Sequence, residues 1–335
     1  MMKIIVTGSA GFIGYYLVKQ LIEYGHEIVG IDNMNDYYDV NLKEFRNSLL
    51  MQNIHYNFYQ ADISDYKIMN SIFSSEKPEI VINCAAQAGV RYSIENPMTY
   101  IKSNLEGFTV VLEMCRHYNI KHLIFASSSS VYGINGKVPF SEHDNVDHPV
   151  SLYAATKKSN ELLAHSYSDL YDMPVSGLRF FTVYGPMGRP DMAYYKFTKA
   201  IIEGTPIDVY NNGNMFRDFT YIDDIIEGIC RLIDIVPVSN DNWDNTSSDP
   251  VETRAPYRIY NIGNNSPISL NEFIETIEIH VGKKAVKNFL PMQKGDVPRT
   301  YADISDLHSA TGFAPSTSLN DGIKKFVNWY KNYYL

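Results

Sequence analysis

The chain has 335 residues, of which 45% are apolar and 20% charged, and a formal net charge of −9, which is typical of a globular protein with one large or two unequal domains. This acidic balance argues against a broad nucleic-acid surface, because binding to phosphates requires clustered Lys and Arg. Three scattered cysteines are too few for a disulfide framework and no apolar run approaches the roughly 20 residues of a membrane span, so we expect a cytoplasmic protein without membrane contact.

The first predicted unit is a strand followed by a glycine turn and a helix. An apolar run at residues 4–6 precedes the sequence TGSAGFIG at residues 7–14. Gly8 permits the reversal out of the strand, and Gly11 leaves room for a pyrophosphate at the helix N-terminus. Gly14 lets the helix pack closely on the sheet. The spacing GxxGxxG in this context predicts a dinucleotide-binding turn, and a purely structural turn is the alternative.

The second predicted strand, residues 27–31, ends in an acidic residue. Asp32 follows this strand and lies eighteen positions after Gly14. A carboxylate at this point accepts hydrogen bonds from the adenosine ribose and repels a 2′-phosphate. The sequence therefore predicts NAD rather than NADP as the cofactor.

Short β-rich runs then alternate with helical ones, as a parallel sheet requires. This pattern predicts a Rossmann-type α/β fold with a doubly wound parallel sheet, whose ligand crevice opens at the carboxyl ends of the strands. We expect an NAD-binding domain over residues 1–185, whose sheet later segments can complete, and a smaller C-terminal substrate-binding lobe over 186–335 with an exposed insertion at 237–256. The further strands are predicted at 55–59, 79–83, 122–126 and 175–180, and the helices at 12–24, 65–75, 98–118 and 153–171.

A Tyr and a Lys four positions apart lie on the helix predicted over 153–171. Residues four apart share one face of a helix, so the Lys157 ammonium can lie near the Tyr153 phenol. A free phenol has a pKa near 10, and a base at neutral pH needs a value lower by about 3, roughly 4 kcal/mol. The ammonium and the positive nicotinamide ring of NAD could supply this together. The alternative is an ordinary surface pair.

Four serines follow the strand at 122–126 and precede Val-Tyr-Gly. Their position predicts hydroxyls at the crevice, where Ser128, Ser129 and Ser130 can share the proton that Tyr153 takes from a sugar alcohol. The alternative is a flexible turn. The nine histidines include no HxxxH or HxH pair with an acidic companion, so no metal is expected.

With these motifs the chain resembles the extended short-chain dehydrogenases/reductases, and within them the nucleotide-sugar epimerases and dehydratases. The resemblance is greatest to the UDP-glucuronate 4-epimerases and runs nearly from end to end. Its more specific pieces are DNMNDYYD at residues 32–39, AAQAGVR at 85–91, RDFTYIDD at 217–224, MQKGDV at 292–297 and TGF at 311–313.

The resemblance implies a set of residues that bind NAD. Asp62 and Ile63 would flank the adenine, and Lys157 would also contact the nicotinamide ribose. Three residues at 85–87 would line the cofactor behind the nicotinamide. The implied cofactor-binding residues are Gly8, Gly11, Phe12, Ile13, Gly14, Asp32, Asn33, Asp62, Ile63, Ala85, Ala86, Gln87, Tyr153 and Lys157.

The resemblance also implies residues that contact a UDP-sugar. Arg217 would meet the pyrophosphate and Asp296 would lie near the nucleotide end, whereas Thr182 and Arg189 are expected near the sugar. Arg91 is a further candidate. Ordinary alternatives are a surface ion pair for Arg91 and a local salt bridge for Arg217. Many relatives that act on neutral sugars carry Asn in place of Thr182 and Arg in place of Gln293, and both departures fit the glucuronate branch.

The implied reaction begins when the tyrosinate takes the proton of the sugar 4-hydroxyl while hydride passes to NAD. Dehydratases usually place an Asp-Glu pair before Val-Tyr-Gly, and decarboxylases that make UDP-xylose commonly place a Glu two positions before that Tyr. Here these positions hold Ser129 and Ser130, so no acid is available at C5. The resemblance therefore favours 4-epimerisation, which interconverts UDP-glucuronate and UDP-galacturonate through a 4-keto intermediate.

Other functions are compatible with the same motifs. A 4-epimerase of neutral UDP-hexoses or N-acetylhexosamines, or a UDP-glucuronate decarboxylase, is the nearest alternative among enzymes. A non-catalytic NAD(H)-sensing protein is a distant alternative, because such proteins tend to lose the Tyr or the Lys.

A homodimer is the expected assembly. The helices near 98–118 and 153–171 match those that form a four-helix interface in the resembled family, and the second carries an apolar stripe. Those side chains could equally face the sheet. The stripe consists of Leu162, Leu163, Tyr167 and Leu170.

Overall fold

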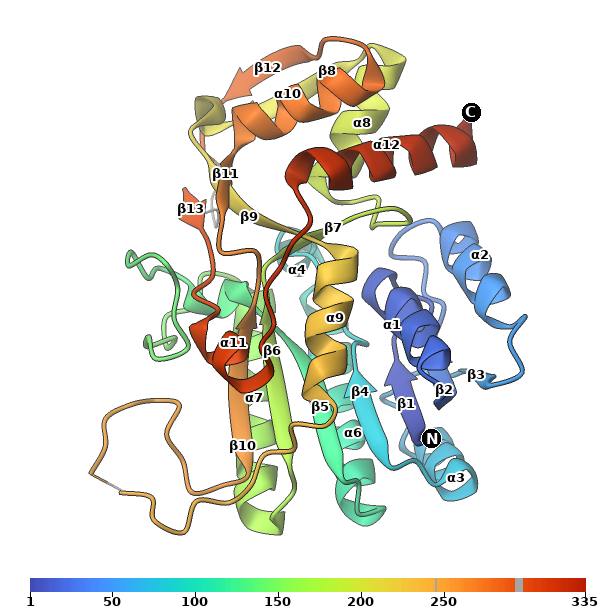
Figure 1. Cartoon of the computed structure of the whole chain (residues 1–335), viewed down its shortest axis with the longest axis vertical. Coiled ribbons are helices and arrows are strands. Elements are labelled where there is room, and N and C mark those ends of the chain that lie inside the picture. Colours follow the sequence, from blue (N-terminus) through green and yellow to red (C-terminus); the bar gives the residue numbers. More distant parts are fainter. Residues whose placement is uncertain (245, 293–297) are drawn as a thin grey trace.

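The computed structural model describes residues 1–244, 246–292 and 298–335. Within these ranges a sheet of seven strands, all paired in parallel, has the order β10-β6-β5-β4-β1-β2-β3 (Figure 1). The predicted Rossmann-type α/β fold is confirmed. Its strands are β1 (Lys3–Thr7), β2 (Glu27–Asp32), β3 (Tyr56–Gln60), β4 (Ile80–Asn83), β5 (His122–Ser128), β6 (Val175–Phe180) and β10 (Tyr257–Ile262).

Helices cover both faces of this sheet (Figure 1). They are α1 (Phe12–Glu23), α2 (Val40–Leu50), α3 (Tyr66–Glu76), α4 (Tyr92–Glu95), α5 (Pro97–Tyr100), the π-helical turn η1 (Ile101–Glu106), α6 (Gly107–His117), the 3-10 helix η2 (Ser129–Tyr132), α7 (Leu152–Tyr171), α9 (Ile222–Leu232) and α11 (Ser305–Thr311).

The alternation of side chains along each strand divides the core into two layers. Ile4 and Val6 of β1 belong to the layer that contains Leu17 of α1 and Ile229 of α9. Ile5, between them, belongs to the opposite layer with Phe108 of α6. Both faces of the sheet are therefore buried, which is why its strands read as continuous apolar runs.

Two elements of the sheet layer come from beyond residue 185. Strand β10 pairs with β6 along its whole length and forms one edge of the sheet. Helix α9 packs against α1, the helix that follows the glycine turn. The sheet predicted over the first half of the chain is thus completed by residues 257–262, which follow the polar insertion.

The helix predicted over 98–118 is present as a continuous helical segment over 97–117. It consists of α5, the π-helical turn η1 and α6. A π-helical turn adds one residue to a helical turn and is frequent at functional sites. Here it carries Asn104, whose buried side chain is directed toward the loop after β4.

The remaining elements form a smaller lobe above the carboxyl edge of the sheet (Figure 1). Strands β8 and β12 pair with each other, and β9 pairs with β7, β11 and β13. No helix in the described ranges combines the length and apolarity needed to cross a bilayer. The lobe contains β7 (Thr182–Tyr184), α8 (Ala193–Glu203), β8 (Pro206–Tyr210), the 3-10 helix η3 (Asn211–Gly213), β9 (Phe216–Tyr221), β11 (Pro267–Ser269), α10 (Leu270–Val281), β12 (Val286–Leu290), β13 (Arg299–Thr300) and α12 (Leu319–Tyr334).

Candidate active site

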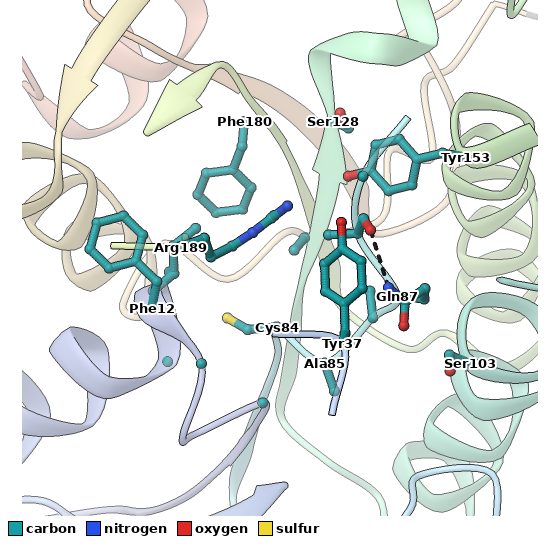
Figure 2. A pocket seen from close by; sticks show the side chains of 18 of the residues that line it. Phe12, Tyr37, Cys84, Ala85, Gln87, Ser103, Ser128, Tyr153, Phe180 and Arg189 are labelled. Carbon is teal, nitrogen blue, oxygen red and sulfur yellow. Dashed lines mark hydrogen bonds between the residues drawn. The ribbon is translucent and has the colours of Figure 1, made fainter. Parts of the chain in front are cut away.

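A cavity of about 430 Å³ opens where the strand order reverses, between the carboxyl ends of β1 and β4 (Figure 2). This is the place where open α/β sheets bind ligands. Most of the residues singled out in the sequence line this one cavity. They are Gly8, Gly11, Phe12, Ile13, Gly14, Asp32, Asn33, Asp62, Ile63, Ala85, Ala86, Gln87, Ser128, Ser129, Ser130, Tyr153, Lys157, Thr182 and Arg189.

The glycine turn cannot carry side chains at its three glycine positions. Gly8 has φ +70°, and a Cβ on it would lie 2.8 Å from the Ala85 backbone nitrogen. A Cβ on Gly11 would lie 2.9 Å, and one on Gly14 only 2.0 Å, from the Gly8 carbonyl oxygen. The bare turn leaves the start of α1 open toward the cavity, as the pyrophosphate of a dinucleotide requires.

Asp32 is fixed by backbone amides on both sides. Its Oδ2 accepts from the Ala10 amide at 3.2 Å and its Oδ1 from the Met34 amide at 2.9 Å. The carboxylate is thereby held at the cavity wall, where a ribose hydroxyl can donate to its remaining lone pairs. Lys43 and Asn35 also line this end, although neither was assigned a role from the sequence, and the Lys43 ammonium donates to the Asn35 carbonyl oxygen at 2.7 Å.

Tyr153 and Lys157 lie on the first turns of α7, whose start is capped by Ser151. The Lys157 ammonium is buried and donates to the Ala126 carbonyl oxygen of β5 at 2.7 Å. Burial lowers the pKa of Lys157 to about 8. The lysine therefore ties the helix that carries the phenol to the strand that carries the serines.

The pKa of Tyr153 differs from the sequence-based expectation. Burial raises the pKa of the phenol, and a hydrogen bond with Ser128 and the Arg189 charge oppose this increase only in part. The protein by itself thus favours the neutral phenol. In the protein alone, the groups that lower this pKa do not offset burial, so we expect the predicted depression only when the positive nicotinamide ring of NAD is present.

The serine run is divided by the end of β5. Ser127 lines the cavity, but its hydroxyl donates to the buried Glu161 Oε1 at 2.6 Å. Ser128 faces Tyr153 in the cavity, and its Oγ accepts from the Ser130 amide at 3.1 Å (Figure 2). Ser129 and Ser130 begin η2 and line the same wall.

The loop behind the nicotinamide position is held by Asn104 of η1. The Gln87 amide donates to Asn104 Oδ1 at 2.8 Å, and Asn104 Nδ2 donates to the Gln87 carbonyl oxygen at 3.1 Å and to Thr156 Oγ1 at 3.0 Å. One side chain thus joins the loop after β4 to the helix of Tyr153. In the sequence this residue is recognisable only as a polar residue within a helical run.

Arg189 enters the cavity opposite Tyr153 (Figure 2). Its Nε and Nη2 donate to the two carboxylate oxygens of Asp191 at 3.0 and 2.6 Å. Asp191 Oδ2 also accepts from the Tyr37 hydroxyl at 3.1 Å. Burial alone would raise the pKa of Asp191, but the Arg189 charge and the hydrogen bonds from Arg189 and Tyr37 together outweigh it, and the pKa lies below its ordinary value. Asp191 and Tyr37 were not among the site residues predicted from the sequence.

Arg91 and Arg217, two of the residues predicted to contact the substrate, are not among the described residues that line this cavity. The Arg91 guanidinium lies 5.1 Å from the centre of the Tyr210 ring, and Arg217 Nη1 donates to the Phe216 carbonyl oxygen at 2.9 Å. Asp296 lies outside the described residues, as does Gln293. Across the described ranges no group of three or more His, Cys, Asp or Glu side chains is arranged to hold a metal ion.

Known proteins are similar to this chain in sequence and in structure. Protein CapI of Staphylococcus aureus is 57% identical over 334 residues, covering 99% of both chains, and a probable UDP-glucuronate 4-epimerase of Rhizobium meliloti is 49% identical over 335 residues, covering 99% of this chain and 98% of its own. The crystal structure of UDP-glucuronic acid 4-epimerase from Bacillus cereus, in complex with UDP-glucuronic acid and NAD, aligns with a TM-score of 0.88 at 33% identity, covering 99% of this chain and all of that one. Residues 4–263 match the NAD dependent epimerase/dehydratase family, and the chain belongs to that family.

Proposed function

We propose that the chain is a UDP-glucuronate 4-epimerase that interconverts UDP-glucuronate and UDP-galacturonate and retains NAD through the cycle. The observation that carries the proposal is the convergence of Tyr153, Ser128 and Arg189 on one cavity beside the glycine turn. A base, a proton-sharing hydroxyl and a cation for a carboxylate are thereby placed around a single ligand. The Bacillus cereus epimerase, similar over nearly the whole chain, supports the proposal.

In the proposed reaction the Tyr153 phenolate takes the proton from the sugar 4-hydroxyl, and the Ser128 hydroxyl, which lines the same cavity, shares it. NAD, when bound, supplies the hydride acceptor and donor at sugar C4. Lys157 holds α7 against β5 through Ala126, so the phenol stays in line with that carbon. The ketone then turns over in the pocket and takes hydride on its other face, and Tyr153 returns the proton.

The same pocket must prevent decarboxylation, because the 4-keto intermediate of a uronate is a β-keto acid. We propose that the carboxylate is held with its C–C bond out of line with the carbonyl π system. Arg189 and the hydroxyls of Ser129, Ser130 and Thr182 line the wall where such hydrogen bonds can form. The absence of an acidic side chain at positions 129 and 130 removes a general acid or base from C5.

Product analysis tests this function directly. The purified protein, supplied with NAD, is incubated with UDP-glucuronate and the nucleotide sugars are separated by anion exchange and identified by NMR. We expect UDP-galacturonate. Its absence would reject the proposed substrate, and accumulation of UDP-xylose would identify a decarboxylase instead. Parallel incubations with UDP-glucose and UDP-N-acetylglucosamine compare the neutral substrates on the same scale.

We further propose that the enzyme is a cytoplasmic homodimer that pairs through α7. The predicted apolar stripe splits in the structure: Leu163 and Tyr167 pack against the core, whereas Leu162 and Leu170 are 58% and 70% exposed. Large apolar side chains exposed together on one helix are typical of an interface. Met98, near the start of the neighbouring helical segment, is 72% exposed and could extend the surface.

A Leu162→Glu variant is therefore expected to be monomeric, because a charge at the centre of an apolar interface is left unpaired when the surfaces meet. Sedimentation velocity at equal protein concentrations measures the change. Ile54→Glu, at an exposed apolar site far from α7, is the matched control and should remain dimeric. A wild-type protein that is monomeric at micromolar concentration, or a Leu162→Glu variant that stays dimeric, contradicts this interface.

A further inference from the structure

Arg46 of α2 is completely buried, yet it lies outside the set of described residues that line the cavity. A buried guanidinium is costly unless its donors are satisfied. Its hydrogen-bond partners therefore indicate what the residue holds in place.

The acceptors of Arg46 come from three segments: the glycine turn, the loop after β2 and the loop after β7. Nη1 donates to the Ala10 carbonyl oxygen of the glycine turn at 3.0 Å and to the Tyr38 hydroxyl at 2.8 Å. Nε donates to the Met187 carbonyl oxygen at 3.1 Å, and Nη2 donates to the Met187 and Gly188 carbonyl oxygens. One planar group thus spans the turn predicted to bind the cofactor and the loop that immediately precedes Arg189.

The loop at 185–191 is tied to the cofactor-binding half at two further points. The Tyr16 hydroxyl of α1 donates to the Pro186 carbonyl oxygen at 3.1 Å. The Tyr37 hydroxyl donates to Asp191, which in turn holds the Arg189 guanidinium. Met187 adopts φ +53°, a strained conformation for a side chain other than Gly, which surrounding contacts must enforce.

We propose that Arg46 is a positioning residue that fixes Arg189 relative to the glycine turn, and so sets the preference for a uronate over a neutral hexose. The inference rests on the proposed function, in which Arg189 meets the sugar carboxylate. Arg46 itself contacts neither ligand in this scheme. It acts by holding the backbone at 187–188 at a fixed distance from Ala10. A less constrained loop would not maintain this distance.

The proposal predicts a selective loss of binding. In an NAD-loaded Tyr153→Phe background, which suppresses turnover, Arg46→Gln should raise the Kd for UDP-glucuronate about tenfold, the size of one displaced charge-assisted hydrogen bond. The Kd for UDP-glucose, which lacks the carboxylate, should change less than about twofold. Isothermal titration calorimetry measures both values.

Two further variants separate geometry from charge and from general damage. Arg46→Lys keeps the charge but cannot bridge both loops, so it should show the same selective loss. Arg231→Gln is the matched control: Arg231 also donates from a helix to a backbone carbonyl, that of Thr311, but at an exposed site away from the cavity, and both Kd values should be unchanged.

Three results would overturn the proposal: equal loss of both ligands, no loss of either, or full binding in Arg46→Lys. If Arg46→Gln does not fold, Arg46→Lys decides alone. A wild-type protein that forms UDP-galacturonate while the variants keep their selectivity refutes the role of Arg46 and leaves the function intact. A wild-type protein that does not bind UDP-glucuronate refutes both.

Discussion

A Tyr153→Phe variant is expected to lose about 10²–10⁴-fold in kcat for the conversion of UDP-glucuronate, the usual contribution of a positioned general acid or base. The substitution removes only the hydroxyl. The ring keeps its edge contact with Tyr100, at 6.1 Å between centroids, so the pocket should retain its shape. Product formation measured by anion exchange gives kcat, and calorimetric binding of UDP-glucuronate shows that the ligand site persists.

The pH profile of the wild-type enzyme tests the role of Tyr153 in a second way. Because the phenolate is the active form, kcat/KM should fall as the pH decreases through the pKa of Tyr153. Burial raises that pKa in the protein by itself and the positive nicotinamide ring lowers it, so the acidic limb of the NAD-loaded enzyme should lie below the pKa of the phenol in the protein alone. Tyr24→Phe, at an exposed tyrosine, is the control for kcat. A Tyr153→Phe variant with unchanged turnover would favour a non-catalytic NAD(H)-binding role.

An Arg179→Met variant is expected to lose about 3–5 kcal/mol of unfolding free energy, because it leaves the buried Glu161 carboxylate with only the Ser127 hydroxyl and the Lys158 ammonium, 3.9 Å away. Arg179 and Glu161 are joined by two hydrogen bonds of 2.9 Å, and each side chain is at most 4% exposed. Burial alone would raise the pKa of Glu161, but the Arg179 charge and the hydrogen bonds from Arg179 and Ser127 together outweigh it and lower that pKa. Urea denaturation monitored by circular dichroism measures the loss.

The exposed pair Arg254–Asp169 provides a geometric control for this prediction. It has the same two-point arrangement, with N···O distances of 2.6 and 2.8 Å, but the Arg254 side chain is 65% exposed. Arg254→Met should therefore cost less than about 1 kcal/mol. Adding Glu161→Leu to Arg179→Met should recover part of the stability, since the buried charge is then removed. Equal effects at the two sites would contradict an account based on burial.

Loss of the Arg179–Glu161 pair should also affect the active site, because Ser127 contacts the same carboxylate. Its hydroxyl donates to the same Glu161 carboxylate, one residue before Ser128 of the cavity. Arg179 also donates to the Tyr132 hydroxyl at 3.1 Å, at the end of η2. The buried pair thus fixes both ends of the turn that carries Ser128 to Ser130, and its loss should lower kcat even in the fraction of protein that remains folded.

Contiguous patterns allowed much of this protein to be predicted from its sequence. The glycine turn, Asp32 and the Tyr153–Lys157 pair each depend on local spacing within one strand-turn-helix unit or one helix. Short continuous apolar runs predicted six strands of the sheet, because parallel strands are buried on both faces. The convergence of these motifs on one cavity follows from the rule that parallel strands place their carboxyl ends at one edge.

Only the tertiary structure decided which distant residues support these motifs. Strand β10 joins the sheet beside β6 after the insertion, and Arg46 reaches Met187 across 141 positions of sequence. No local period encodes such contacts, because their energy comes from burial and from hydrogen bonds that exist only once the loops meet. The sequence by itself determined the chemical groups and their order along the chain. The tertiary structure decided their environment and orientation: burial raises the pKa of Tyr153, and the Lys157 ammonium donates to the Ala126 carbonyl oxygen.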